Sequence, residues 1–246
     1  ITNILCFIFF FLTSSSLLEA QSTDTFTPAE KAEISKLVRQ YIKRNPEIIL
    51  EALEDIQEQE QIQKEKEQRT QLKLNEKFIE RDIDDPILGN LDGKIIVTEF
   101  FDYQCGYCKR MLKILLDISK AHNDVKIVLK EYPILGPVST LAAQVALAAK
   151  KQNKYAEMHA ALMQLKGRLS EKAIFQIAKE LGLDTEQLQE DMKDPKILNH
   201  LTRTRELGKR LMIRGTPAFI INSTISPGAL TKHQLLELIA QVRDKR

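Results

Sequence analysis

Apolar residues recur along the first part of the chain with the three- and four-residue spacing of an amphipathic helix. Thr27 and Pro28 precede the first apolar stripe and are typical of a helix cap and a first helical turn. Asn45 and Pro46 repeat this signal before a second stripe. Residues 57–71 are nearly all Glu, Gln, Lys and Arg, which favour a helix but offer almost nothing to bury. The pattern predicts a helical extension ahead of the globular part.

This helical extension covers residues 21–85, and its apolar stripes need a partner. The charged segment could be an exposed arm, a stalk, a coiled-coil-like segment or a solvated linker helix. The apolar stripe between residues 34 and 56 must be buried somewhere. We therefore expect self-association into a homo-oligomer through residues 28–80.

A different pattern begins after the turn-forming residues at positions 84–93. Residues 95–101 form a short apolar run typical of a buried strand, and residues 109–120 carry a helical stripe. Residues 125–131 alternate between apolar and polar, as a second strand does. Strand, helix and strand in this order predict two parallel strands joined by a right-handed crossover.

Helical patterns fill most of the chain after the second predicted strand. A last strand follows at residues 218–222, then a turn at residues 226–228 and a final helix at residues 231–243. We therefore predict an α/β fold over residues 86–246, with a helical insertion at about residues 136–213.

Composition and charge exclude several classes of function. The chain has 246 residues, is 43% hydrophobic and 28% charged, and carries a formal net charge of +2. This balance gives no general attraction to nucleic acid or to anionic lipid. No helix-turn-helix, zinc-finger or RNA-binding signature accompanies it. We therefore expect no nucleic-acid partner.

The first twenty residues predict an exported protein. Residues 4–12 are an unbroken apolar run, about half of the ~20 residues that a membrane-spanning helix needs. Polar Thr and Ser residues follow, and Ala20 suits a cleavage site. We interpret residues 1–20 as a secretory signal peptide; the alternative is an uncleaved anchor over residues 4–18.

Cysteine usage then points to chemistry and not to a disulfide framework. Cys6 lies in the predicted signal peptide, which leaves Cys105 and Cys108 in the run Cys-Gly-Tyr-Cys. Structural zinc needs four ligands, and the histidines of the chain lack paired ligand spacing. Lys109 stands where a haem-attachment motif would carry His. A redox-active dithiol between a strand and a helix remains, with no metal and no cofactor expected.

The position of the dithiol predicts unequal roles for its sulfurs. At the start of a helix, Cys105 would face free backbone N–H groups and the positive end of the helix dipole, which favour the thiolate. Cys108 lies one turn later and would be the shielded, resolving thiol. The alternatives for the pair are an inert structural disulfide and the binding of copper(I) by two thiolates.

Glu99 is the third candidate, because it lies in the otherwise apolar strand that ends shortly before Cys105. If its carboxyl is buried, its pKa would be raised and it could exchange protons with Cys108. The alternative is a glutamate on the solvent face of an edge strand.

Two motifs in a fixed order carry a resemblance to a known family. The run Glu-Phe-Phe-Asp-Tyr-Gln-Cys-Gly-Tyr-Cys at residues 99–108 is followed by Gly-Thr-Pro-Ala-Phe at 215–219 and Pro-Gly-Ala-Leu at 227–230. Over roughly residues 86–246, the chain resembles the DsbA-like thiol–disulfide oxidoreductases of bacterial periplasms. The resemblance implies a thioredoxin-like fold with an inserted helical domain and a periplasmic location.

The resemblance also implies roles for individual residues. Cys105 would form the mixed disulfide, Cys108 would resolve it, and Glu99 would assist proton transfer. A cis peptide bond before Pro217 is implied, with the Thr216 backbone pairing with an extended substrate peptide. The substrates would be unfolded or reduced exported proteins, and a membrane protein of the DsbB type would be the redox partner.

Tyr107, which we expect to contact the substrate, marks a departure from the family. The well-known oxidases carry Pro-His between the cysteines, where a charged His would stabilise the thiolate; Tyr107 offers only a hydroxyl. We therefore expect a less oxidising couple. Gly-Tyr, the Thr before Pro217 and the N-terminal extension are also similar to the dimeric periplasmic disulfide isomerases. We expect disulfide formation in exported proteins, with isomerase or reductase activity or copper binding as alternatives.

Overall fold

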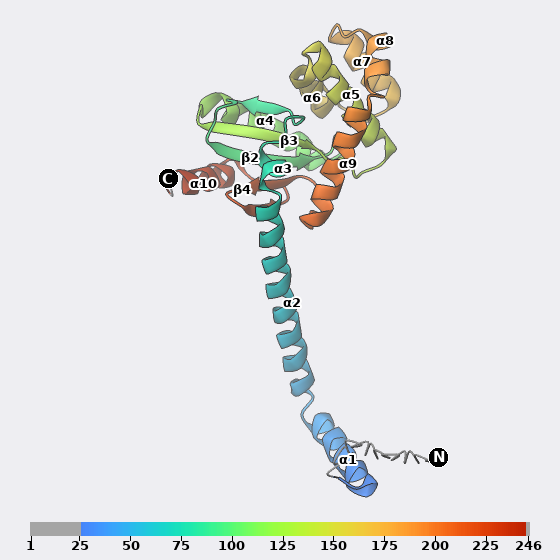
Figure 1. Ribbon diagram of the computed structural model, residues 1–246, viewed down its shortest axis with the longest axis vertical. Helices are drawn as coiled ribbons and strands as arrows, with labels where there is room; N and C mark the ends of the chain where they lie inside the picture. The colour runs from blue at the N-terminus through green and yellow to red at the C-terminus, as the bar shows by residue number, and fades with distance from the viewer. Residues whose placement is uncertain (1–25, 245–246) are drawn as a thin grey trace, which may run out of the picture. The chain divides into compact units, whose positions relative to one another are not determined.

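The computed structural model describes residues 26–244 of the chain (Figure 1). Its contacts divide the chain into two units, with the boundary between Gln59 and Glu60. The predicted signal peptide at residues 1–20, with Cys6, lies outside the described residues. Within the described part, no helix is both long enough and apolar enough to cross a bilayer.

The first unit contains helix α1 (Pro28–Arg44) and the first turns of helix α2 (Glu47–Leu74). Thr27 caps α1 reciprocally: its hydroxyl accepts from the Glu30 backbone, and the Glu30 carboxylate accepts from the Thr27 backbone. The apolar stripe predicted from the sequence is present but exposed. Its exposed members in this unit are Ile34, Leu37, Val38, Tyr41, Ile49, Leu53 and Ile56.

The second unit begins inside α2, ahead of the turn-forming residues at which the sequence suggested a domain boundary. Leu72 near the end of α2 and Ile79 in α3 (Glu76–Glu80) are buried. The Thr98 hydroxyl donates to the Ile79 carbonyl, and the Gln68 amide donates to the Leu211 carbonyl. The buried side chains of Leu72 and Ile79 therefore attach the last turns of α2 to the rest of the second unit.

A five-stranded sheet forms the centre of the second unit, in the order β1-β3-β2-β4-β5. The strands are β1 (Ile87–Gly89), β2 (Ile95–Phe101), β3 (Val125–Glu131), β4 (Ala218–Ile221) and β5 (Thr224–Pro227). β2 and β3 pair in parallel, which confirms the prediction from the strand–helix–strand pattern, and the other pairs are antiparallel.

The predicted turn at residues 226–228 was wrong for Ser226 and Pro227, which belong to β5. The turn lies earlier, at Asn222 and Ser223, where both residues have positive φ. A proline is tolerated here because β5 is an edge strand, so that one side of its backbone needs no ladder partner.

Helices cover both faces of the sheet (Figure 1). One face packs against α4 (Gly106–Ala121), α10 (Lys232–Arg243) and the helical insertion. The insertion consists of α5 (Pro137–Ala149), α6 (Tyr155–Gln164), α7 (Glu171–Glu180), α8 (Thr185–Asp191) and α9 (Pro195–Arg210). The other face packs against α3, the end of α2 and the end of α9. β2 is thus buried on both faces, which explains its nearly continuous apolar run.

Candidate active site

Cys105 is the N-cap residue of α4, as the sequence pattern predicted. Its sulfur accepts the backbone N–H of Cys108 at 3.4 Å. The Cys105 thiol also donates to the Thr216 carbonyl at 3.1 Å. The residue is largely buried, with 7% of its surface exposed. A backbone donor at a helix N-terminus is the environment that stabilises a thiolate.

Cys108 lies in the first turn of the same helix and is fully covered by the core. Burial, together with the negative charge of nearby Glu99, raises the pKa of the Cys108 thiol far above its ordinary value. Cys108 therefore has the buried position and disfavoured thiolate that are expected of a resolving thiol.

Glu99 is 2% exposed and lies in the central strand β2. The alternative of a solvent-facing glutamate on an edge strand is therefore wrong. Burial, reinforced by the charge of Cys105, raises the pKa of Glu99 to about 8. Its Oε1 has no hydrogen-bond partner among the described residues. A buried carboxyl next to a dithiol can hold a proton near neutral pH, but its part in catalysis stays a prediction.

The Thr216–Pro217 peptide bond is cis, as the family resemblance implied. The loop that carries it leads into β4, which pairs with β2, and this connection places the Thr216 carbonyl beside Cys105. The Gly228 backbone N–H donates to the Pro217 carbonyl at 2.8 Å and holds the loop from the other side. A cavity of about 410 Å³ adjoins Thr216 and Pro217, with Gln68 of α2 on its wall.

Tyr107, between the two cysteines, has an exposed side chain. The guanidinium carbon of Arg110 lies 4.1 Å from the centre of its ring, which is a cation–π contact. The structure thus gathers all six predicted site residues around the start of α4 and adds an arginine that the sequence analysis did not single out.

Asp102 is a second residue that the sequence analysis missed. One of its carboxylate oxygens accepts from the Gln104 backbone and the Ser139 hydroxyl. The other accepts from the backbone N–H groups of Ile134 and Leu135. One hydrogen bond within the loop and three from residues 134–139 fix the segment that leads to Cys105. The available signal was an aspartate directly after an apolar strand and three residues before the first cysteine.

A buried hydrogen-bond network centred on Glu131 also supports the loop between β2 and Cys105. The hydroxyls of Tyr103 and Tyr155 both donate to Glu131 Oε1, at 2.7 and 2.9 Å. Tyr103 also lies 3.1 Å from His159 Nδ1. Burial raises the pKa of Glu131 to about 8, against the lowering effect of the two hydroxyls. The network ties the active-site loop to α6 of the insertion.

A dithiol at a helix N-terminus, facing a cis-proline loop on a thioredoxin-like sheet, defines a thiol–disulfide oxidoreductase site. Residues 96–240, more than half of the chain, match the family described as "DSBA-like thioredoxin domain". The chain belongs to this family. Residues 30–63 match a second family, described as "Copper resistance protein ScsC N-terminal domain".

Solved structures are similar over the same regions. A thioredoxin-like oxidoreductase from Silicibacter pomeroyi is 39% identical, with a TM-score of 0.67, and the match covers 68% of this chain and 97% of that protein. A linker-deletion mutant of Proteus mirabilis ScsC is 30% identical, with a TM-score of 0.68, over 92% of this chain and all of that one.

The curated relatives that the chain matches are Na⁺/H⁺ antiporters. The match to NhaA 3 of Salinispora tropica is 24% identical over 140 residues, which is 56% of this chain and 22% of the antiporter. The chain thus spans about a fifth of the length of the curated relatives it matches. A match of this extent carries no transport activity over to this chain.

We predict that Glu99→Gln changes the pH dependence of folding stability in the reduced protein. Because the folded pKa of about 8 exceeds the ordinary value of 4.5, the folded state holds this proton more tightly. Wild-type stability should therefore fall as pH rises from 4.5 to 8, and the variant should lack this part of the fall. At pH 8 the variant should be more stable, by at most about 5 kcal/mol.

Urea unfolding at several pH values measures this difference. The raised pKa of Glu131 also makes stability fall with rising pH, but it does so equally in both proteins. The difference between their pH dependences therefore reports on Glu99. Glu206→Gln, at an exposed position on α9, is the control and should leave the slope unchanged. If the free energy of unfolding changes with pH equally in wild type and Glu99→Gln, the Glu99 carboxyl does not hold its proton more tightly in the folded state, and the prediction is wrong.

Proposed function

We propose that this protein catalyses thiol–disulfide exchange with cysteines of exported proteins, and that it donates the Cys105–Cys108 disulfide to them. The observation that carries this proposal is the placement of the Cys105 sulfur between the N-terminus of α4 and the Thr216 carbonyl. The predicted signal peptide supports action in the periplasm, and a membrane protein of the DsbB type would reoxidise the dithiol.

The reaction proceeds in two exchanges. A substrate thiolate attacks Cys105 of the oxidised protein, the Cys105–Cys108 bond breaks, and its electron pair leaves on Cys108. A second substrate thiolate then attacks the substrate sulfur of the mixed disulfide, and Cys105 leaves as a thiolate. The substrate loses two electrons and the dithiol gains them, so that no external cofactor takes part.

Glu99 gives the leaving Cys108 a proton in this scheme. The raised pKa of Cys108 means that a bare thiolate at this buried position is strongly disfavoured. With its own pKa raised to about 8, Glu99 is largely protonated at neutral pH and lies beside the dithiol. A proton donor of this kind lowers the cost of breaking the internal disulfide.

Substrate recognition uses the backbone of the cis-proline loop. An extended peptide would pair with the Thr216 backbone by strand addition, which needs no particular side chain and so accepts many proteins. The cavity beside Thr216 and Pro217 offers room for a substrate side chain, and the exposed Tyr107 ring offers an apolar contact.

Cysteine variants test this function directly. With Cys6→Ser in every form, reduced Cys108→Ser should accumulate a mixed disulfide with an unfolded substrate that carries a disulfide. The Cys105 thiolate attacks one substrate sulfur, the other leaves as a thiolate, and no Cys108 thiol remains to break the mixed disulfide. Cys105→Ser should accumulate none, and both should lose at least about 10³-fold in refolding rate relative to wild type. Trapping is read on non-reducing gels. Equal trapping by both variants, or copper(I) in the purified protein without any exchange activity, would exclude the proposal.

Disulfide isomerisation is a second candidate, favoured by the exposed apolar stripe of the first unit and the match of residues 30–63 to the ScsC N-terminal family. Further copies of this chain would cover the stripe and bring several dithiols into one assembly. In this direction, Cys105 starts as a thiolate and attacks a substrate disulfide. An oxidase should be recovered from cells as the disulfide and an isomerase as the dithiol, which acid quenching and alkylation distinguish.

We predict that Leu37→Glu dissociates the oligomer that this second candidate requires. Leu37 lies in the exposed stripe of α1, where a charge would be buried against another copy. Ala32→Glu adds the same charge to the opposite side of the same helix and is the control. Light scattering should give a lower mass for Leu37→Glu alone. A monomeric wild type, or equal masses for all three, would contradict self-association through this stripe.

A further inference from the structure

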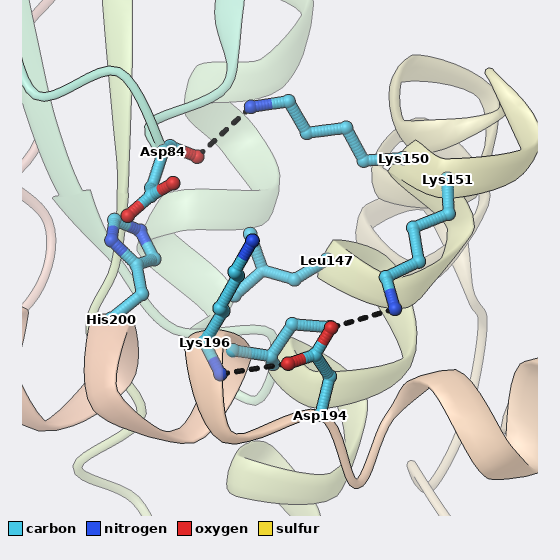
Figure 2. A pocket seen from close by; sticks show the side chains of 8 residues that line it. Asp84, Leu147, Lys150, Lys151, Asp194, Lys196 and His200 are labelled. Carbon is cyan, nitrogen blue, oxygen red and sulfur yellow. Dashed lines mark hydrogen bonds and ion pairs between the residues drawn. The ribbon is translucent and has the colours of Figure 1, made fainter.

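A second cluster of chemically active side chains lies at the join between the loop after α3 and helix α9. Asp82 and Asp84 come from the loop, and His200 comes from α9. One ligand atom from each lies within 4.8 Å of those of the other two. Asp84 and His200 also line a cavity of about 290 Å³, and Figure 2 shows their side chains together at one side of it.

His200 is held between carboxylates on both sides of its ring. The residue is 2% exposed, and its Nδ1 lies 3.9 Å from Asp82 Oδ2. Its Nε2 lies 3.4 Å from Asp85 Oδ1, while the other oxygen of Asp85 is bound by Lys130. Both His200 Nε2 and Asp85 Oδ1 are buried without a hydrogen-bond partner among the described residues. A histidine that binds a metal through one nitrogen usually directs the other N–H at a carboxylate in this way.

One nitrogen of the Arg203 guanidinium lies close to Asp82, Asp84 and His200 together. Arg203 Nη2 lies 2.6 Å from Asp84 Oδ2, 3.6 Å from Asp82 Oδ2 and 3.5 Å from His200 Nδ1. The arginine side chain is 42% exposed and can turn out to solvent. The cluster is therefore arranged around a positive charge, carried by a side chain that reaches solvent.

We propose that Asp82, Asp84 and His200 form a binding site for a divalent transition-metal ion, with zinc as the representative ion. Two carboxylates and one imidazole suit zinc, whereas magnesium and calcium prefer oxygen ligands alone and copper(I) prefers thiolates. The ion would take the position of the Arg203 guanidinium nitrogen. Asp85 would orient the His200 ring from its Nε2 side.

The geometry requires only a small rearrangement. Zinc binds oxygen and nitrogen at about 2.0–2.2 Å, so tetrahedral donors lie roughly 3.5 Å apart and the present cluster must contract by about 1 Å. Asp84 is 44% exposed and can make this movement. The fourth position is open to the cavity for water. Lys150, whose Nζ donates to the Asp84 carbonyl at 3.1 Å, opposes a cation there and limits its affinity.

Zinc titration of the disulfide form tests this site, because the oxidised dithiol cannot bind the metal. Competition with a chromophoric chelator should give one zinc per chain, and zinc but not magnesium should raise the melting temperature. Asp84→Asn should weaken zinc binding by at least about tenfold, because loss of a ligand costs no less than loss of an outer-shell partner, which costs about 10–100-fold. Arg203→Gln should tighten it several-fold, because the competing charge is gone.

A matched control exists elsewhere on the second unit. Arg243 pairs with Asp124, and its Nη2 lies 3.4 Å from His122 Nδ1, but this part of the described chain does not bring three possible metal ligands together. Asp124→Asn and Arg243→Gln should leave zinc affinity unchanged. Absence of zinc binding, binding only after Arg203→Gln, or binding that Asp84→Asn does not weaken would each overturn the proposal and leave an ion-pair cluster.

Discussion

The contact between the Cys105 sulfur and the Thr216 carbonyl joins residues 111 positions apart, and the rest of the globular unit is arranged so that the two can meet. β2 delivers Cys105 to the start of α4, and β4 pairs with β2 to bring the cis-proline loop alongside. The whole helical insertion lies between them in the chain. The insertion must therefore fold so that the chain returns to the dithiol at its end. The geometry of the site thus depends on the insertion.

Two buried glutamates near the dithiol illustrate two different environments for the same side chain. Glu131 receives two tyrosine hydroxyls on one oxygen, so its carboxyl is anchored and fixes the active-site loop. Glu99 has an oxygen without a partner among the described residues. An unpaired buried acceptor costs roughly 1–3 kcal/mol. The proposed proton exchange with Cys108 gives this unfavourable placement a use, whereas packing alone does not account for it.

The sequence was sufficient to predict the central strands, their parallel pairing and the cap position of Cys105. Each of these follows from a local pattern of apolar residues or from one helix start. The burial of Glu99 was left open, because the local pattern does not say whether its strand is central or at an edge of the sheet. The roles of Asp102 and of the residues around His200 could not be predicted, because their partners come from segments far away in the chain. The attachment of the last turns of α2 was also hidden, since the apolar residues at 72–79 are few and follow a long charged stretch, so that the sequence does not show which of them are buried.

Both edges of the sheet are short. β1 has three residues and ends at Gly89, while β5 has four and ends at Pro227, which cannot donate to a neighbouring strand. Long, flat edges invite other chains to add to them and aggregate. The substrates proposed above are unfolded polypeptides, which are the chains most able to add to an open sheet edge. Under that proposal, the short edge strands leave the cis-proline loop as the place for substrate pairing and keep the protein from seeding aggregates of its own substrates.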